Sequence, residues 1–326
     1  MATESHILWI LIPALLLVLA AAGVAVWALW VRRRALPEIP EPGEDGLVRH
    51  LDVAYVGEEG AHPVRHRLDV FAPAGGRRLP VLVFVHGGGW SMGHKSSGTL
   101  GMYDKTGETL ARLGFVVVMP NYRLTPWVRH PEHIRDVARA FMWARTHAAR
   151  YGGDPGCTFV GGHSAGGHLA ALLATDSSYL EALGGGARDV RGCVVVSGVF
   201  RIGDFVERFA RIPVLRYLES MGPAFGMDPE IRRAASPLSH VAASMPPFLV
   251  VYGDGEWYGL DRQAEEFVAA ARGAGGRVES LRLERRNHVT IMSRARHAGD
   301  PLVQAIAAFV GRWAKEKGPR FRAGPA

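Results

Sequence analysis

The stretch GGHSAGG, residues 161–167, decides how the fold is interpreted. Before it runs Cys157–Val160, a short β-branched and aromatic segment that is typical of a buried strand. After it comes His168–Ala174, which is rich in the strong helix formers leucine and alanine. Strand, Gly-x-Ser-x-Gly and helix in this order predict a sharp turn that lifts the Ser164 hydroxyl above the edge of a sheet, because the flanking glycines carry no side chains to clash.

The same glycines have two other interpretations. A plain glycine-rich turn would need no serine, and a phosphate-binding loop would use residues 162–167 as a cradle. No Lys-Ser/Thr pair follows, and the sequence has no Gly-x-Gly-x-x-Gly spacing with a downstream acid, so phosphate binding is disfavoured. The predicted helix also points its N-terminus at the serine, which puts the Ala165 amide where an oxyanion would develop. We therefore interpret Ser164 as a nucleophile.

A second glycine loop supports this interpretation. His86–Trp90 reads HGGGW and follows the continuous apolar run Val81–Val85, which is typical of a strand covered on both faces. Three glycines allow backbone N–H groups to point inward instead of pairing with a strand, as an oxyanion hole requires. The second donor would come from Ala165, directly after the nucleophile. A glycine-rich loop without this role is the alternative.

Fourteen histidines compete for the role of the base that activates the serine. Most have a local explanation: His86 opens the glycine loop, and His163 and His168 flank the serine turn. His288 differs because it lies between the last predicted strand and the last predicted helix, at the carboxyl edge of the sheet where Ser164 is also expected. Its position matches the chain order serine, acid, histidine.

The acid that would orient this histidine is expected in the loop GDGEW, Gly253–Trp257, after the preceding predicted strand. A carboxylate there must accept the imidazole N–H and stabilise the imidazolium. Asp254 and Glu256 both qualify by position, and a spacing of three residues after the first glycine favours Glu256. Asp204 and Asp261 stay open as less favoured alternatives.

Strands and helices alternate from about Leu47 onward. The expected strands are 48–56, 64–71, 81–85, 115–119, 157–160, 193–196, 248–252 and 278–283, and the expected helices are 101–113, 131–151, 165–174, 261–272 and 301–315. This alternation predicts a mostly parallel eight-stranded sheet with helices on both faces, in which the first two strands can form an antiparallel pair. The stretch 202–241 breaks the alternation and is interpreted as a lid within a domain spanning 47–316.

The N-terminus carries a different pattern. Ile7–Val31 contains no charged residue, and twenty-five residues at ~1.5 Å each exceed the ~30 Å of a bilayer's hydrocarbon core. A cleaved signal peptide is the alternative, but the first five residues carry no Lys or Arg. Residues 1–34 are therefore predicted to be a single-pass membrane anchor. Arg32–Arg34 after the span place the following domain on the cytoplasmic side.

The composition limits the domain size, the type of binding partner and the state of the cysteines. The 326 residues are 48% hydrophobic, enough for one large domain, and the net charge of +7 is scattered. The sequence has no basic stripe interleaved with aromatic residues, so it does not indicate a nucleic-acid partner. Cys157 and Cys193 each open a predicted strand, so buried thiols are expected, and a disulfide stays open if the strands are neighbours. Residues 35–46 are predicted to be a Pro/Glu-rich linker, and 317–326 a disordered tail.

The motifs, in chain order, are HGGGW, NYRL, GGDP, GHSAGG, ASPL, VYGDGE and RRNHVTIM. Over about Leu47–Trp313 they resemble the α/β-hydrolase fold, and within it the hormone-sensitive-lipase and carboxylesterase group. The stretches HGGGWSMGHKSSGTLG and ARYGGDP are similar to the branch that contains kynurenine formamidase and isoprenylcysteine methylesterase. One position departs from the family, whose acid is usually Asp where this chain has Glu256.

The resemblance implies hydrolysis of a small acyl ester or lipid-like substrate through Ser164, without a metal or an organic cofactor. It implies that the amides of Gly88, Gly89 and Ala165 hold the oxyanion. An arylformamidase, which cuts a formamide C–N bond with the same groups, is a second possibility. A non-catalytic binding protein on this fold is a third, disfavoured because the nucleophile and the base are both present.

Overall fold

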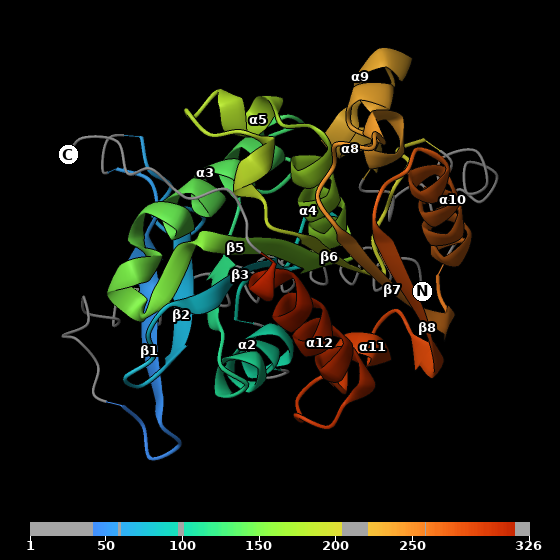
Figure 1. The fold of residues 1–326 in the computed structure, drawn as a ribbon. Helices are drawn as coiled ribbons and strands as arrows, with labels where there is room; N and C mark the ends of the chain where they lie inside the picture. The colour runs from blue at the N-terminus through green and yellow to red at the C-terminus, as the bar shows by residue number, and fades with distance from the viewer. Residues whose placement is uncertain (1–41, 58–59, 97–100, 204–220, 258, 317–326) are drawn as a thin grey trace, which may run out of the picture. The chain divides into compact units, whose positions relative to one another are not determined.

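A computed structural model describes residues 42–57, 60–96, 101–203, 221–257 and 259–316, which belong to the compact unit that begins at residue 41 (Figure 1). Within these ranges no helix is both long enough and apolar enough to cross a membrane. The predicted anchor at 1–34, the predicted tail at 317–326 and most of the predicted linker lie outside the described residues.

Within the described residues, eight strands form one sheet. They are β1 (Leu47–Ala54), β2 (Arg67–Pro73), β3 (Leu79–Val85), β4 (Val116–Pro120), β5 (Gly153–His163), β6 (Cys193–Val196), β7 (Phe248–Gly255) and β8 (Val278–Asn287). The spatial order is β1-β2-β4-β3-β5-β6-β7-β8. Strand β2 is antiparallel to β1 and β4, and all other neighbours are parallel. The predicted mostly parallel sheet and its antiparallel first pair are confirmed.

Helices cover both faces of the sheet, as predicted (Figure 1). One face carries α2 (Met102–Arg112), α11 (Thr290–Ser293) and α12 (Pro301–Lys315), and the other carries α3 (Glu132–His147), α4 (Ala165–Thr175) and α10 (Leu260–Gly273). The shorter helical segments are α5 (Ser178–Glu181), α8 (Met221–Phe225), α9 (Pro229–Ala234), η2 (Ala148–Tyr151), η3 (Ala187–Asp189) and η4 (Pro237–His240).

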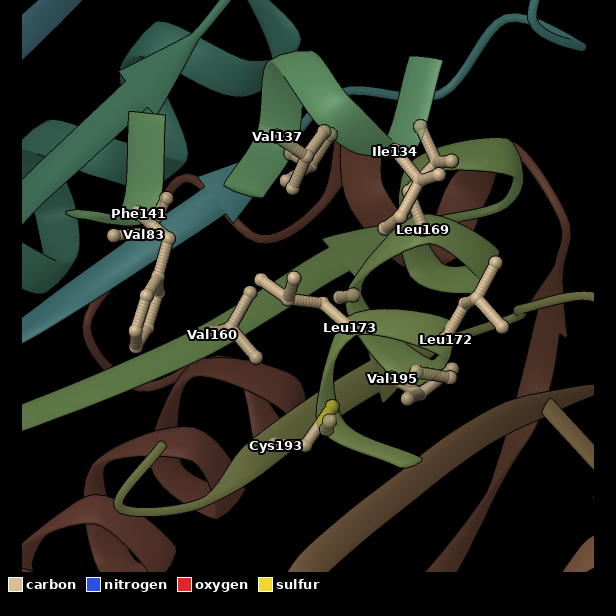
Figure 2. Close-up of a cluster of buried hydrophobic side chains, with 14 of the residues drawn as sticks. Val83, Ile134, Val137, Phe141, Val160, Leu169, Leu172, Leu173, Cys193 and Val195 are labelled. Carbon is tan, nitrogen blue, oxygen red and sulfur yellow. The ribbon is translucent and has the colours of Figure 1, made fainter. Parts of the chain in front are cut away.

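Strand β3 shows how both faces are filled. The odd-numbered residues of Val81–Val85 belong to the cluster under α3 and α4, and the even-numbered ones to the cluster under α2 and α12. Figure 2 shows the first cluster, where Phe141 of α3 and Leu173 of α4 lie beside Val83 and Val160. Fully burying such side chains contributes about 1.5–3 kcal/mol each. The continuous apolar run in the sequence is thus explained by burial on two sides.

Strand β5 is longer than predicted, and its cysteine is not bridged. The strand begins at Gly153 instead of Cys157, because Gly153 already pairs with Leu79 of β3 through a register shift. Cys193 is buried as expected, whereas Cys157 is only half-buried, and both are free thiols. Burial raises the pKa of each thiol, that of Cys157 to about 11, so both stay protonated at neutral pH. The disulfide that the sequence left open is not formed.

The predicted long helix is shorter than expected, and the predicted lid is described only in part. Helix α3 ends at His147, and the 3₁₀ turn η2 follows it and ends at Tyr151, just before Gly152, whose φ is 82°. Within the predicted lid, residues 204–220 lie outside the described residues, and the later part contains α8, α9 and η4. Phe225 of α8 packs edge-on against Trp90 of the glycine loop, with ring centroids 4.9 Å apart. Its role as a lid stays a prediction.

Candidate active site

Ser164 lies between β5 and α4 in a strained backbone conformation. Its φ of 55° and ψ of −122° belong to a region that residues with side chains rarely adopt. The Ser164 amide donates to the Val196 carbonyl at 2.9 Å, and its carbonyl accepts from the His168 amide at 2.9 Å. These bonds tie the turn to β6 and to the first turn of α4. The predicted strand, turn and helix around the serine are therefore present.

The glycines of this turn allow very close backbone contacts. A Cβ atom at Gly162 would lie 2.4 Å from the Gly166 carbonyl oxygen, and one at Gly166 would lie 2.2 Å from the Val85 carbonyl oxygen. Both distances are far shorter than a van der Waals contact. The turn therefore has no space for a side chain at either position.

Gly162→Ala should destabilise the protein by about 1–3 kcal/mol, because the new methyl group meets backbone atoms that cannot rotate away. At about 2–4 °C per kcal/mol for a domain of this size, thermal unfolding should show a clearly lower Tm. The matched control is Gly299→Ala, since a Cβ there meets nothing within 4 Å. Equal melting temperatures for the two variants would contradict the close contact.

The structure brings together the serine, the histidine and one of the candidate acids. The Nε2 atom of His288 lies 2.8 Å from the Ser164 hydroxyl oxygen, and its Nδ1 lies 3.0 Å from the Glu256 carboxylate. A carboxylate only accepts, so the proton of neutral His288 is on Nδ1, and Nε2 is free to accept the serine proton. His288 is buried. This arrangement can activate the hydroxyl as a nucleophile.

Glu256 lies in the loop after β7, and three hydrogen-bond donors hold its carboxylate. Its carboxylate accepts from the Ser197 hydroxyl, from the Gly253 amide at 3.0 Å and from His288. Burial raises the pKa of Glu256, but these hydrogen bonds outweigh burial and place the pKa below its ordinary value. The carboxyl group is therefore ionised at neutral pH and can orient the imidazole.

The other candidate acids are placed differently. Asp254 is exposed and accepts from the Arg285 and Arg286 amides of β8, at 2.8 and 3.1 Å. Asp261 lies in the first turn of α10, and Asp204 lies outside the described residues. Among the described candidates, Glu256 is the one for which a hydrogen bond to His288 is found.

The glycine loop follows β3 at the same sheet edge. Gly88 and Gly89 have φ values of 121° and 57°, and the Gly88 carbonyl accepts from the Met92 amide at 3.0 Å, which closes the loop. Ala165 is the first residue of α4, where amides have no partner inside the helix. In the part of the chain that the structure describes, none of these three amides donates to a protein acceptor. They can therefore serve an anionic oxygen, which is the role that the sequence predicts.

Two aromatic rings enclose the imidazole of His288. Trp257 stacks on it with ring centroids 4.5 Å apart and an interplanar angle of 26°, and His163 lies at 4.8 Å and 41°. A cation over an indole face is stabilised by about 0.5–1 kcal/mol at exposed sites. An imidazolium formed during a reaction would lie against the indole of Trp257.

Sequence reasoning missed three residues around this site: Ser197, Trp257 and Tyr103. Ser197 directly follows β6, and its place at the carboxyl end of a parallel strand is a signal that could have found it. Trp257 is adjacent to Glu256 in the same loop. Tyr103 gives no local signal, because its partners Gly87 and His163 are 16 and 60 residues away.

Comparison with known proteins gives one matching family model and several relatives. The BD-FAE model matches residues 68–269, more than half of the chain. Esterase LipQ of Mycobacterium tuberculosis is 30% identical over 282 residues, which cover 85% of this chain and 65% of that protein. The probable isoprenylcysteine alpha-carbonyl methylesterase ICMEL1 of Arabidopsis thaliana is 25% identical over 238 residues, 70% of this chain and 49% of that protein. The chain thus spans about half to two thirds of these relatives.

A solved structure shows the same arrangement of elements. The hyperthermophilic esterase from the archaeon Pyrobaculum calidifontis is 25% identical, with a TM-score of 0.66 over 81% of this chain and 85% of that one. Sequence and fold therefore agree with the resemblance inferred from the motifs. The chain belongs to the BD-FAE family, within the esterase-containing part of the α/β-hydrolase fold.

Proposed function

We propose that the protein is a serine carboxylesterase, in which Ser164 is the nucleophile, His288 the general base and Glu256 the acid that orients it. The observation that carries this proposal is the pair of contacts on His288, 2.8 Å to the Ser164 hydroxyl and 3.0 Å to the Glu256 carboxylate. The esterase names of LipQ and of the Pyrobaculum protein support the proposed bond type.

The first half of the reaction forms an acyl-enzyme. The Ser164 oxygen bonds to the ester carbonyl carbon while its proton passes to His288 Nε2, and the carbonyl oxygen becomes an oxyanion. The amides of Gly88, Gly89 and Ala165 donate to that oxyanion. The tetrahedral intermediate then breaks the bond to the alcohol, which leaves with the proton from His288.

The second half releases the acid. A water molecule gives its proton to His288 Nε2 and attacks the acyl carbonyl carbon, and the same three amides stabilise the second oxyanion. Breaking the bond to Ser164 returns the proton to the serine oxygen. Throughout both halves Glu256 accepts the Nδ1 proton and keeps the imidazole in one tautomer.

Full-length protein in detergent should hydrolyse p-nitrophenyl acetate, butyrate and octanoate, and release of nitrophenol measures kcat/KM for each. N-formylkynurenine is the comparison substrate, because an arylformamidase would use the same groups on a formamide C–N bond. We expect faster hydrolysis of the esters. Turnover of N-formylkynurenine with a higher kcat/KM than every ester would replace the proposal with the formamidase.

We further propose that residues 1–34 anchor the protein in a membrane with the hydrolase domain on the cytoplasmic side. The uncharged run Ile7–Val31 and the arginines that follow it support this proposal. Full-length protein should stay in the membrane fraction after a carbonate wash. A Thr3→Cys variant should react with an impermeant thiol reagent added to intact cells, with wild type as the control for the native cysteines. Reaction only after lysis would reverse the orientation.

A further inference from the structure

A chain of three buried hydrogen bonds, called here the hydrogen-bond chain, connects the glycine loop to the backbone of His288. The Gly87 amide donates to the Tyr103 hydroxyl at 2.8 Å, that hydroxyl lies 2.9 Å from Nδ1 of His163, and Nε2 of His163 lies 2.9 Å from the His288 carbonyl. Tyr103 and His163 are both buried. The mechanism proposed above uses neither side chain.

The direction of each bond in this chain follows from its partners. The His288 carbonyl only accepts, so His163 carries its proton on Nε2. Burial lowers the pKa of His163 well below its ordinary value, and the neighbouring His288 lowers it further, so the ring is neutral and Nδ1 accepts. Tyr103 then donates to Nδ1 while it accepts from Gly87. Burial raises the pKa of Tyr103 to about 12, so the hydroxyl keeps this proton.

The hydrogen-bond chain joins the three segments that carry the proposed chemistry. Gly87 belongs to the glycine loop, His163 is the last residue of β5 before Ser164, and His288 follows β8. A Cβ atom at Gly87 would lie 2.8 Å from the Tyr103 hydroxyl and 3.1 Å from Nδ1 of His163. The glycine loop therefore packs directly on this hydrogen-bond chain.

We propose that His163 and Tyr103 are positioning residues, which hold the backbone of His288 and the glycine loop in register on either side of Ser164. The proposal rests on the carboxylesterase function proposed above. Fixing the His288 carbonyl limits the movement of its imidazole relative to the serine. Fixing the Gly87 amide limits the movement of the neighbouring amides that would bind the oxyanion. A shift of about 1 Å in such groups can cost about 10²-fold in rate.

The test compares variants that keep or remove individual hydrogen bonds. His163→Gln retains an N–H donor that can reach the His288 carbonyl, whereas His163→Leu fills a similar volume without a donor. We expect the leucine variant to lower kcat by about 10²-fold, with KM within about threefold of wild type. The kcat of the glutamine variant should be about tenfold or more above that of the leucine variant. Tyr103→Phe should lower kcat by about tenfold.

Two further readouts separate positioning from packing. The double variant Tyr103→Phe/His163→Leu should lose less kcat than the product of the two single losses, because both single variants remove the same Tyr103–His163 hydrogen bond. Nitrogen-15 NMR of the full-length protein should show His163 as the neutral Nε2–H tautomer near neutral pH, independently of any substrate. Observation of the Nδ1–H tautomer would overturn the proposal.

The kinetic outcomes are decisive in either direction. The proposal fails if folded His163→Leu keeps kcat within about twofold of wild type, or if His163→Gln is as slow as His163→Leu. If the leucine variant does not fold, Tyr103→Phe decides, since it removes a single oxygen, and an unchanged kcat overturns the proposal. Failure of the proposed function is distinguishable, because wild-type protein itself would then hydrolyse none of the esters or would turn over N-formylkynurenine with a higher kcat/KM than every ester.

Discussion

Ser164→Ala should lower kcat by about 10⁴-fold or more while the protein keeps its fold. The substitution removes the single oxygen that lies 2.8 Å from His288 Nε2. Alanine adopts the positive φ of this turn no less readily than serine does, so the backbone strain is unchanged. Hydrolysis of p-nitrophenyl butyrate measures the loss, and thermal unfolding checks the fold.

A fluorophosphonate reagent gives a second measurement of the same prediction, because it bonds to an activated serine. Wild type should be labelled and Ser164→Ala should not. The matched control is Ser178→Ala, the same chemical change at an exposed serine beyond the C-terminal end of α4, which should be labelled like wild type. Strong labelling of Ser164→Ala would place the nucleophile at another residue.

Glu256→Gln should lower kcat by up to about 10⁴-fold, whereas Asp254→Asn should lower kcat by less than about tenfold. The glutamine amide can donate where only acceptance from His288 Nδ1 is useful, so the imidazole loses its correct tautomer. Asp254 instead accepts from two backbone amides of β8 at the surface, away from the imidazole. The two variants are each other's control, because each replaces one carboxylate of the same loop by its amide.

A third variant, Glu256→Asp, should keep part of the activity, since the carboxylate survives and only its reach shortens. Steady-state kinetics with p-nitrophenyl butyrate measures all three variants. If Asp254→Asn is inactive and Glu256→Gln is near normal, Asp254 takes the role of the acid. If both are mild, the acid lies outside this loop, and Asp261 is the next residue to test.

The sequence was most informative where local pattern and long-range structure agree. Strand Cys193–Val196 and helix Pro301–Lys315 have the predicted bounds, because an apolar run and a proline after an acidic N-cap are local signals. Strand β5 was predicted too short, because its first residues read as a Gly-Asp-Pro turn and pair only across the sheet. A local sequence pattern does not indicate which distant strand a residue pairs with.

The same distinction applies to the candidate site. Ser164, His288 and the acid loop could be located from motif, chain order and the expected sheet edge. The contacts of Glu256 with Ser197 and of His163 with the His288 carbonyl join residues 59 and 125 positions apart. Such contacts depend on how the ends of β5, β6, β7 and β8 are placed by the register of the sheet. They follow from the tertiary fold and have no local pattern.

The stacking of Trp257 on His288 also makes the site optically observable. Indole fluorescence is quenched on contact by a protonated imidazole, and these two rings are 4.5 Å apart. Emission from Trp257 should therefore fall while His288 holds the serine proton and recover when the proton leaves. Stopped-flow fluorescence of wild type, with Trp257→Phe as the control that lacks this indole, would then report the protonated state of His288 under single-turnover conditions without a chromogenic leaving group.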